Sequence, residues 1–379
     1  AQGKADLFAA TLDAALLAQP GYGPALIAQA RAKAGRGDFD AALAMLEEVT
    51  LKNPDSEEAY KLKGDILRMA KNQPDPALAA YRQAIKAKPS YVAGQLGVIN
   101  VLLAQGKLDD ATTEMAVLKK IAGGQPQTRF MEAHLAYQKK DYKAAREQIL
   151  QVLKSVQGNA AVLQLAGAIE FQLNSMVQAE SYLAKAVQSA PGLALARRLL
   201  VLTYLRTGQV PKALATLPPD LAKNDRDVDM LSVAGQAYLQ SGDVAKAQEF
   251  FGRAAKLDPK DPRKRTSLAM THMMSGQVDS AFGELQEVAA TDTGTVADMA
   301  LISAYLQRKE FDKALKAIDA LEKKAPTDPQ AAQLQGRTLL AKQDMAGARK
   351  SFERALTIDA KFFPAIASLA ALDMAEKKP

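Results

Sequence analysis

The chain has 379 residues, of which 48% are apolar, and it contains neither cysteine nor tryptophan. The absence of cysteine excludes a disulfide framework, a thiolate metal site and a cysteine nucleophile. The net charge of +7 comes from 49 basic and 42 acidic residues. This near balance, without a long basic run, argues against a nucleic-acid binder. No apolar run is long enough to cross a bilayer, and residues 1–20 lack the basic start and apolar centre of a signal peptide.

An alanine recurs along the chain at an almost constant step. The successive steps are 35, 34, 34, 34, 34, 34, 34, 33 and 34 residues. The ten positions are Ala42, Ala77, Ala111, Ala145, Ala179, Ala213, Ala247, Ala281, Ala314 and Ala348. A period in this range is typical of stacked helical repeats rather than of a single globular core. Repeat arrays of this kind are mostly binding surfaces.

Residues 1–22 are predicted to form a partial repeat that consists of a second helix alone. Leu12 lies 34 residues before Leu46, and Pro20 lies the same distance before Pro54. The first half of this unit is missing, so we expect the chain to be a piece of a longer array.

Residues 23–217 are predicted to form six complete repeats. The sequence pattern of one repeat is clearest further along the chain, at residues 228–261. There Leu231 and Tyr238 recur at helical spacing, Gly242 breaks the pattern, and Ala247 and Phe251 begin a second helical pattern. A proline then stops the second helix. Each repeat is therefore predicted to be an amphipathic helix, a tight turn and a second amphipathic helix.

The sixth repeat contains two prolines where a second helix is expected. Pro218 and Pro219 follow Leu217 directly, and a proline inside a helix costs about 3 kcal/mol. We predict that this helix ends near Leu217 and that residues 220–225 form a short irregular segment. The break is interpreted either as a local kink with unchanged stacking or as a hinge between two segments.

Residues 218–360 predict four more repeats, numbers seven to ten. Residues 361–379 predict a partial repeat that consists of a first helix, because Ile366, Leu369 and Ala370 recur at helical spacing. The predicted fold is thus an all-α superhelix of ten helical hairpins with a half-repeat at each end.

The pattern resembles that of the tetratricopeptide repeat family. Its small residue in the first helix and its terminating proline recur along the chain, at Gly64, Gly167, Gly235 and Gly336 and at Pro54, Pro89, Pro191, Pro259 and Pro326. The tryptophan that is common early in the family unit is missing throughout. The resemblance implies an α-α superhelix, a non-catalytic role and protein or peptide partners.

Residues 165–217 resemble more closely the tetratricopeptide lipoproteins that accompany bacterial exosortase (PEP-CTERM) sorting systems. The similarity rests on Pro191-Gly192-Leu193, the run of residues 196–200 (ARRLL) and Tyr204-Leu205. This resemblance implies a periplasmic protein linked to exopolysaccharide production and anchored by a lipidated cysteine. The present sequence has no cysteine, so a lipid anchor is expected only in the parent protein.

No catalytic constellation emerges from the sequence. The two histidines, His134 and His272, are far apart, and His272 occupies the position that Tyr238 holds one repeat earlier, which favours packing. No nucleotide-binding glycine motif is present. We therefore expect no enzyme activity, no cofactor and no metal.

The candidate partner-binding residues lie on the first helices, which line the concave face in arrays of this kind. One inward position per repeat, with some neighbours, gives a mixed and amide-rich set that suits an extended peptide. The set is Arg31, Asp65, Asn100, His134, Tyr137, Gln164, Arg198, Gln236, Met270, Ser303 and Arg337. Each could equally be solvated helix surface.

The predicted function is a non-catalytic interaction scaffold of the bacterial envelope, which binds protein or extended peptide and not nucleic acid. Two alternatives stay open. The first is a cytosolic peptide-binding adaptor, and the second is the docking array of a larger enzyme.

Overall fold

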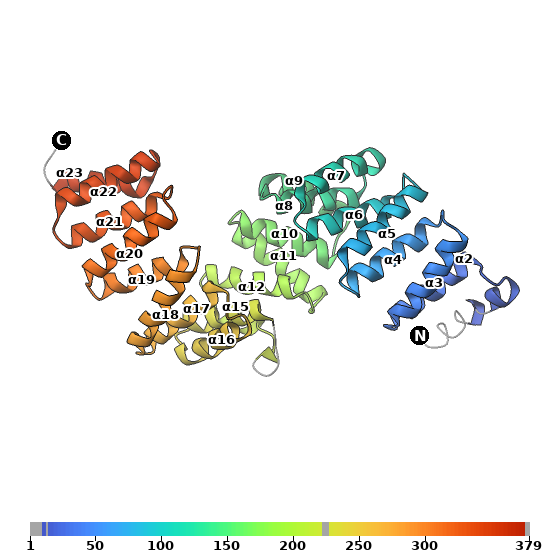
Figure 1. Cartoon of the computed structure of the whole chain (residues 1–379), viewed down its shortest axis with the longest axis horizontal. Coiled ribbons are helices and arrows are strands. Elements are labelled where there is room, and N and C mark those ends of the chain that lie inside the picture. Colours follow the sequence, from blue (N-terminus) through green and yellow to red (C-terminus); the bar gives the residue numbers. More distant parts are fainter. Residues whose placement is uncertain (1–9, 13, 222–226, 376–379) are drawn as a thin grey trace. The chain divides into compact units, whose positions relative to one another are not determined.

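A computed structural model describes residues 10–12, 14–221 and 227–375, and these residues form helices and turns with no strand among them. Figure 1 shows the helices following one another as antiparallel pairs along the chain. The predicted all-α architecture of repeated helical hairpins is confirmed. The chain divides into two compact units, residues 1–199 and residues 200–379. The predicted division at Pro218 stays a prediction.

Unit 1 contains five hairpins. Their first helices are α2 (Gly23–Gly35), α4 (Glu57–Met69), α6 (Val92–Ala104), α8 (Pro126–Gln138) and α10 (Ala160–Gln172). Their second helices are α3 (Phe39–Lys52), α5 (Pro74–Ala87), α7 (Leu108–Ala122), α9 (Tyr142–Ser155) and α11 (Met176–Ser189). Each first helix contacts the first helix of the next hairpin, from α2 to α10. The first helices of unit 1 therefore form one continuous layer, whose exposed surface we call the first-helix face.

Unit 2 repeats the same alternation. Its first helices are α15 (Val228–Gln240), α17 (Pro262–Met274), α19 (Val296–Gln307), α21 (Pro329–Ala341) and α23 (Phe363–Ala375). Its second helices are α13 (Val210–Thr216), α16 (Val244–Leu257), α18 (Val278–Thr291), α20 (Phe311–Lys324) and α22 (Met345–Ile358). Helix α12 (Ala194–Arg206) crosses the division between the units.

The ten periodic alanines are the most buried positions of the repeats. Each of them has 0% of its surface exposed. They begin the buried stripe of every second helix, where a larger side chain would separate the two helices of the hairpin. The periodicity seen in the sequence is therefore the periodicity of the helix crossings.

In most hairpins a second contact joins the two helices, between a small residue of the first helix and a large residue of the second. A Cβ atom added at Gly235 would lie 2.8 Å from the ring of Phe251, and one added at Gly336 would lie 2.4 Å from the ring of Phe352. Where the first helix carries alanine instead, the partner is aliphatic: Ala133 shares a core cluster with Ile149. The two side chains thus fill a fixed space together.

The turn inside every hairpin contains one residue in the left-handed region, five positions before the periodic alanine. Five of these ten residues are glycines and five are not, and their φ angles run from 51° to 88°. The non-glycine residues are Asn72, Lys140, Asn174, Lys309 and Gln343. The left-handed turn position therefore recurs in all ten hairpins, whether or not the sequence has the residue that adopts it without strain, although the turn between α4 and α5 is one residue longer than the others.

The prolines of the sixth repeat shorten its second helix as predicted. Helix α13 has seven residues and ends at Thr216, and Leu217 is extended with φ −60° and ψ 145°. Leu221 then places its side chain in the core with Met230 and Phe250, while its carbonyl accepts a 2.8 Å hydrogen bond from Arg253. Leu221 thus supplies apolar contacts near the end of the shortened helix. Residues 222–225 of the predicted irregular segment lie outside the described residues.

Both partial repeats contain a helix among the residues that the structure describes. Residues 10–12 and 14–18 are helical at the start of the chain, and α23 forms at its end, as the spacing of Ile366, Leu369 and Ala370 predicts. Residues 19–22 and 361–362 are turns or irregular, and residues 1–9, 13 and 376–379 lie outside the described part.

Substitution of Gly235 by alanine should destabilise the hairpin, because the new methyl group would meet the ring of Phe251. We expect a loss of about 1–3 kcal/mol in the free energy of unfolding, measured by urea denaturation. The second substitution Phe251→Leu should recover part of that loss, because the other hairpins combine alanine with an aliphatic residue. A double variant that is less stable than both single variants would contradict this account of the crossing.

Lys309→Gly should stabilise the protein, because Lys309 has a φ of 58° and a side chain there costs about 1 kcal/mol. The matched reverse change is Gly242→Ala, at a φ of 87° with no heavy atom within 4 Å of the new methyl group. That change should raise only backbone strain and lower the melting temperature. Thermal melts that move both variants in the same direction would contradict the assignment.

Candidate functional site

All eleven predicted binding residues lie on first helices or on α12. Five of them are exposed, namely Arg31, Gln236, Met270, Ser303 and Arg337. Six are half-buried, namely Asp65, Asn100, His134, Tyr137, Gln164 and Arg198. They do not form one uniform surface, and the neighbours of each residue decide what it can do.

Unit 1 contains a largely apolar cleft of about 450 Å³ between α6, α8, α9 and α10. We call it the α6–α10 cleft. It is lined by Leu96, Asn100, Pro126, Gln127, Phe130, Met131, Val152, Val156, Asn159, Ala161 and Val162. None of these side chains is charged, and the polar ones are three carboxamides. Of the predicted binding residues, the cleft contains Asn100.

Helical spacing brings these side chains together. Leu96 and Asn100 are four residues apart on α6, and Gln127 and Phe130 are three apart on α8, so each pair lies on one side of its helix. Asn159 caps the start of α10 by accepting hydrogen bonds from the backbone amides of residues 161 and 162, at 3.0 and 3.2 Å. This cap fixes the wall of the cleft that α10 provides.

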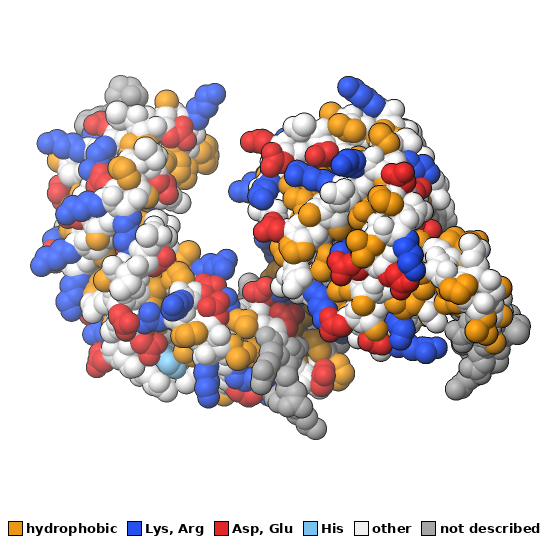
Figure 2. Space-filling view, turned by 45° about the vertical axis from the view of Figure 1, so that its right-hand side comes forward, with side chains coloured by type: hydrophobic (Ala, Val, Ile, Leu, Met, Phe, Trp, Pro, Cys, Tyr) orange, Lys and Arg blue, Asp and Glu red, His pale blue; other side chains and the backbone are white. Residues whose placement is uncertain are grey.

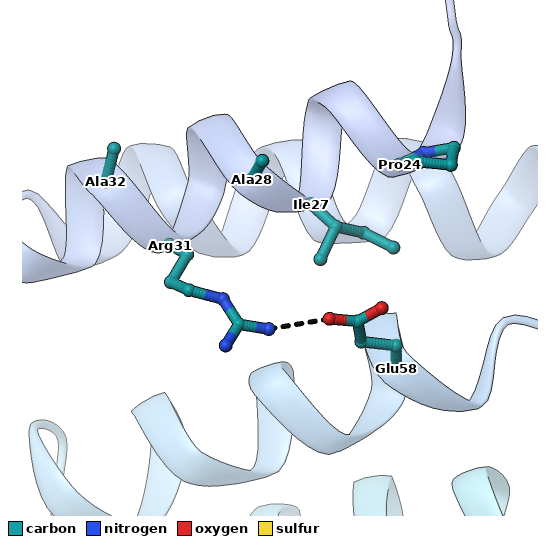
Figure 3. A pocket seen from close by; sticks show the side chains of 6 residues that line it. All are labelled: Pro24, Ile27, Ala28, Arg31, Ala32 and Glu58. Carbon is teal, nitrogen blue, oxygen red and sulfur yellow. Dashed lines mark hydrogen bonds and ion pairs between the residues drawn. The ribbon is translucent and has the colours of Figure 1, made fainter. Parts of the chain in front are cut away.

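Arg31 lies in a separate recess of about 410 Å³ between α2 and α4. Figure 3 shows its guanidinium group directed at Glu58, beside the apolar side chains of Pro24 and Ile27. The Nη2 to Oε1 distance is 2.6 Å, and both side chains are more than half exposed. An ion pair this exposed contributes about 0–1 kcal/mol. Arg31 is therefore accessible to a ligand that can compete for its charge.

Asp65 is occupied by internal partners. Its carboxylate accepts a 2.8 Å hydrogen bond from the hydroxyl group of Tyr81 and lies 2.6 Å from Nζ of Lys61. The pKa of Tyr81 is raised above its ordinary value, mainly because the side chain is buried and to a smaller extent because its hydroxyl group donates a hydrogen bond to Asp65. Asp65 thus orients the tyrosine ring that packs between Gly64 and Gly97. The structure gives it a packing role.

His134 and Tyr137 lie one turn apart on α8, next to the α6–α10 cleft. The ring of His134 is 6.5 Å from that of Phe130, and its Nε2 atom is 3.5 Å from Nε2 of Gln138. Burial lowers the pKa of His134 below its ordinary value of 6.5, because the charged ring is less well solvated there. The ring of Tyr137 packs 5.6 Å from that of Tyr142. The neutral ring of His134 adds to the uncharged character of this surface.

Residues 17–292 match the sequence profile of a family described as tetratricopeptide repeat. The chain belongs to the tetratricopeptide repeat family. Residues 262–362 also match a profile described as a tetratricopeptide repeat-like domain. Proteins of this family generally act as interaction scaffolds that bind protein partners.

Two curated proteins resemble parts of the chain. Over 102 residues, or 27% of this chain, it is 31% identical to the human protein O-mannosyl-transferase TMTC1. Over 272 residues, or 69% of this chain, it is 23% identical to the mouse superkiller complex protein 3. The matched parts cover only 12% and 17% of these two proteins.

Two solved structures share the fold at low sequence identity. A tetratricopeptide repeat protein from Parabacteroides merdae matches with a TM-score of 0.50 at 15% identity, over 66% of this chain and 98% of its own. The Cut9–Hcn1 hetero-tetramer of the APC/C contains a chain that matches with a TM-score of 0.52 at 13% identity, over 92% of this chain and 76% of its own. These likenesses support the architecture of stacked tetratricopeptide hairpins.

The structure also contains a buried charge that the sequence analysis did not single out. Glu170 is 2% exposed on α10 and pairs with Nε of Arg146 on α9 at 2.9 Å. Most equivalent residues of the other repeats are aromatic or aliphatic, among them Tyr204, Tyr238 and Leu67. A glutamate at such a position was therefore a signal available from the sequence. The contact joins two helices, while the second carboxylate oxygen of Glu170, Oε2, is buried without a hydrogen-bond partner.

His272 occupies the same repeat position and has a packing partner there, as its alignment with Tyr238 predicts. Its Nδ1 atom lies 3.2 Å from both carboxylate oxygens of Glu284 on the second helix of the hairpin. Within the described residues, no group of three or more histidine, cysteine or acidic side chains is placed to hold a metal ion. In the same part of the chain, no helix is both long and apolar enough to span a membrane.

Charged side chains of both signs are interspersed over the face of the molecule that Figure 2 shows. Charged side chains also form ion pairs between neighbouring hairpins, such as Lys71 with Asp40 and Arg354 with Glu322. That face carries no large patch of basic charge alone.

Stability should decrease between pH 7.5 and pH 5.5 through the protonation of His134. The pKa of His134 is lower in the folded state than in the unfolded state, so the unfolded chain binds the proton more readily and stability is lost as the pH falls. The hydrogen bonds from Arg263 hold the pKa of Asp261 well below its ordinary value, so this carboxylate titrates below the window. Urea denaturation at both pH values should show a smaller loss for His134→Gln. An equal loss in both proteins would contradict this role.

Proposed function

We propose that the protein is a non-catalytic scaffold of the bacterial envelope that binds extended protein segments along the first-helix face. The observation that carries the proposal is the α6–α10 cleft, whose eleven lining residues are all uncharged. Neighbouring parts of the same face are strongly charged, as at Arg31 and Glu58. An uncharged cleft within a charged surface favours an apolar side chain of a partner.

The chemistry of the cleft suits an extended peptide. Its apolar walls can cover a leucine or phenylalanine side chain, whose burial contributes about 1.5–3 kcal/mol. The carboxamides of Asn100, Gln127 and Asn159 offer hydrogen-bonding groups to the peptide backbone on either side of that side chain. The volume of about 450 Å³ lies within the range of small ligand sites. The remaining candidate residues of the first-helix face would contact the rest of the segment.

The envelope location rests on the resemblance of residues 165–217 to the lipoproteins of exosortase systems. On this proposal the parent protein is periplasmic, is anchored by a lipid that is absent from the present sequence, and recruits components of an exopolysaccharide or protein-sorting machine. A cytosolic adaptor would use the same cleft in the same way, so crosslinking in living cells, followed by mass spectrometry, is needed to decide the location.

A second candidate function is a docking array within a larger enzyme. The match to the human O-mannosyl-transferase supports it, because the similar part is a small fraction of that longer protein. The array would then position a substrate protein for catalysis elsewhere. The two candidates agree in assigning protein binding, and not chemistry, to the residues described above.

Peptides selected from a random phage-displayed library on the full chain should carry one or two apolar side chains and few charges. Asn100→Arg should weaken their binding by about tenfold or more, because a guanidinium group would enter an uncharged cleft. The matched control is Val177→Arg, which introduces the same charge at an exposed residue of α11 that belongs neither to the cleft nor to the candidate binding residues. Fluorescence anisotropy of labelled peptides measures both effects. Selected peptides that are mainly acidic, or that bind both variants equally, would contradict the proposal.

A further inference from the structure

Three methionines lie close together at the end of α17, in unit 2. They are Met270, Met273 and Met274, whereas the other nine of the 12 methionines are spread singly along the chain. Because an α-helix turns by about 100° per residue, these three positions fall within one arc of about 100° on its surface. Side chains three and four residues apart on a helix are neighbours, so the three thioether groups can meet around a single point.

Packing of the hairpin does not require two of these methionines. Met270 is 46% exposed and Met274 is 58% exposed. The preceding repeat has Gln236 and Gln240 at the same two positions, and its helix α15 packs in the same way. The core therefore accepts a polar side chain at both places. Two flexible, exposed thioethers on one side of a helix are available to a ligand.

The third thioether is held by the core, and the neighbouring imidazole lies elsewhere. Met273 is partly buried and packs against the cluster that contains Phe282 and Leu285. His272 has its Nδ1 atom 3.2 Å from both carboxylate oxygens of Glu284. Two residues along a helix correspond to a rotation of about 200°, so His272 lies on the side of α17 opposite the two exposed methionines. The cluster is therefore made of sulfur ligands alone.

The position of the cluster on its helix favours a cation. Met274 is the last residue of α17, and the C-terminal end of a helix carries a partial negative charge that stabilises positive ions. Residues 266–276 contain neither lysine nor arginine. No permanent positive charge of this segment therefore opposes the approach of a metal ion.

We propose that Met270, Met273 and Met274 bind a soft monovalent metal ion of the Cu(I) class. Thioether sulfur is a soft and uncharged ligand that selects Cu(I), whereas Mg²⁺ and Ca²⁺ require oxygen ligands. Within the described residues, histidine, cysteine and acidic side chains form no metal-binding group, so the thioethers have no competitor of that kind. This site lies outside the α6–α10 cleft and does not rest on the function proposed for that cleft.

Ag(I) is a suitable probe, because it is a soft monovalent ion that does not change its oxidation state under these conditions. The full chain, labelled with ¹³C at its methionine methyl groups, is titrated with silver nitrate in chloride-free buffer and followed by NMR. The methyl resonances of the three clustered methionines should shift and saturate with a Kd below about 100 μM, while the other nine stay in place. Cu(I), kept reduced under anaerobic conditions, should shift the same three resonances.

Leucine variants remove one sulfur atom at a time and keep the apolar volume. Met270→Leu and Met274→Leu should each assign one shifting resonance and weaken binding by about tenfold or more. The matched control is Met69→Leu, because Met69 is 73% exposed at the same repeat position as Met274 and is the only methionine of α4. Affinity should be unchanged in this control, and thermal melts should agree for all variants. No saturable shift, or equal weakening in all three variants, would overturn the proposal.

The pH dependence of the affinity separates thioether ligands from other ligands. A histidine or carboxylate must lose its proton to bind a metal, so such a site weakens as the pH falls. A thioether binds no proton in this range, and the affinity for Ag(I) should therefore be equal at pH 7.5 and pH 5.5. His272→Gln should also leave it unchanged. Binding that falls at pH 5.5 and is lost in His272→Gln would overturn the assignment to the methionines and place the ion at His272 and Glu284.

Discussion

The distance between the two helices of each hairpin depends on one small residue and the large residue that packs over it. At Gly235 and Gly336 there is no room for even one additional carbon atom, because an aromatic ring occupies the space. At some crossings the first helix supplies more volume and the second helix less, as Ala133 with Ile149 illustrates beside Gly235 with Phe251. The helices can therefore keep a similar separation although the residues at the crossing differ. That separation lets hairpins stack at a regular interval, since cores are packed closely and respond to a change of one methylene group.

The turns and the helix ends adapt to this interval. The left-handed turn position is retained even where the chain has Lys140 or Gln343 and backbone strain is the consequence. In the sixth hairpin Pro218 ends the second helix early, and the side chain of Leu221 contributes to the core beside it. At the turns, the preference of non-glycine residues for other backbone conformations is overridden. In the sixth hairpin, the loss of helix after Pro218 is compensated by Leu221, and in both cases the buried contacts are preserved. This order of priorities is expected when tertiary packing supplies most of the stability of short helices.

The sequence was sufficient for the features that every repeat shares. The alanine period predicted the helical hairpins, and the two prolines predicted the short helix α13, because both signals act within one repeat. The sequence was not sufficient for contacts whose partners differ from hairpin to hairpin. Asp65 was assigned to the binding surface, but its carboxylate is taken up by Tyr81 and Lys61. The α6–α10 cleft escaped notice because residues of three hairpins line it, and no single unit contains it. Whether the other candidate residues bind a partner is a question that position on a helix does not answer.

The periodic positions carry no information about a partner because they are buried. The ten alanines have no exposed surface, so any two arrays with this architecture share them whatever they bind. On the proposed function, specificity comes from the exposed first-helix positions, and these vary in charge from one repeat to the next. Adjacent repeats can also combine their residues: Arg31 and Glu58 give a charged recess at one place, and Asn100 and Phe130 contribute to an uncharged one at another. On the proposed function, a partner would therefore be recognised by a group of two or three neighbouring hairpins, whereas the sequence pattern that specifies the fold repeats with every single hairpin.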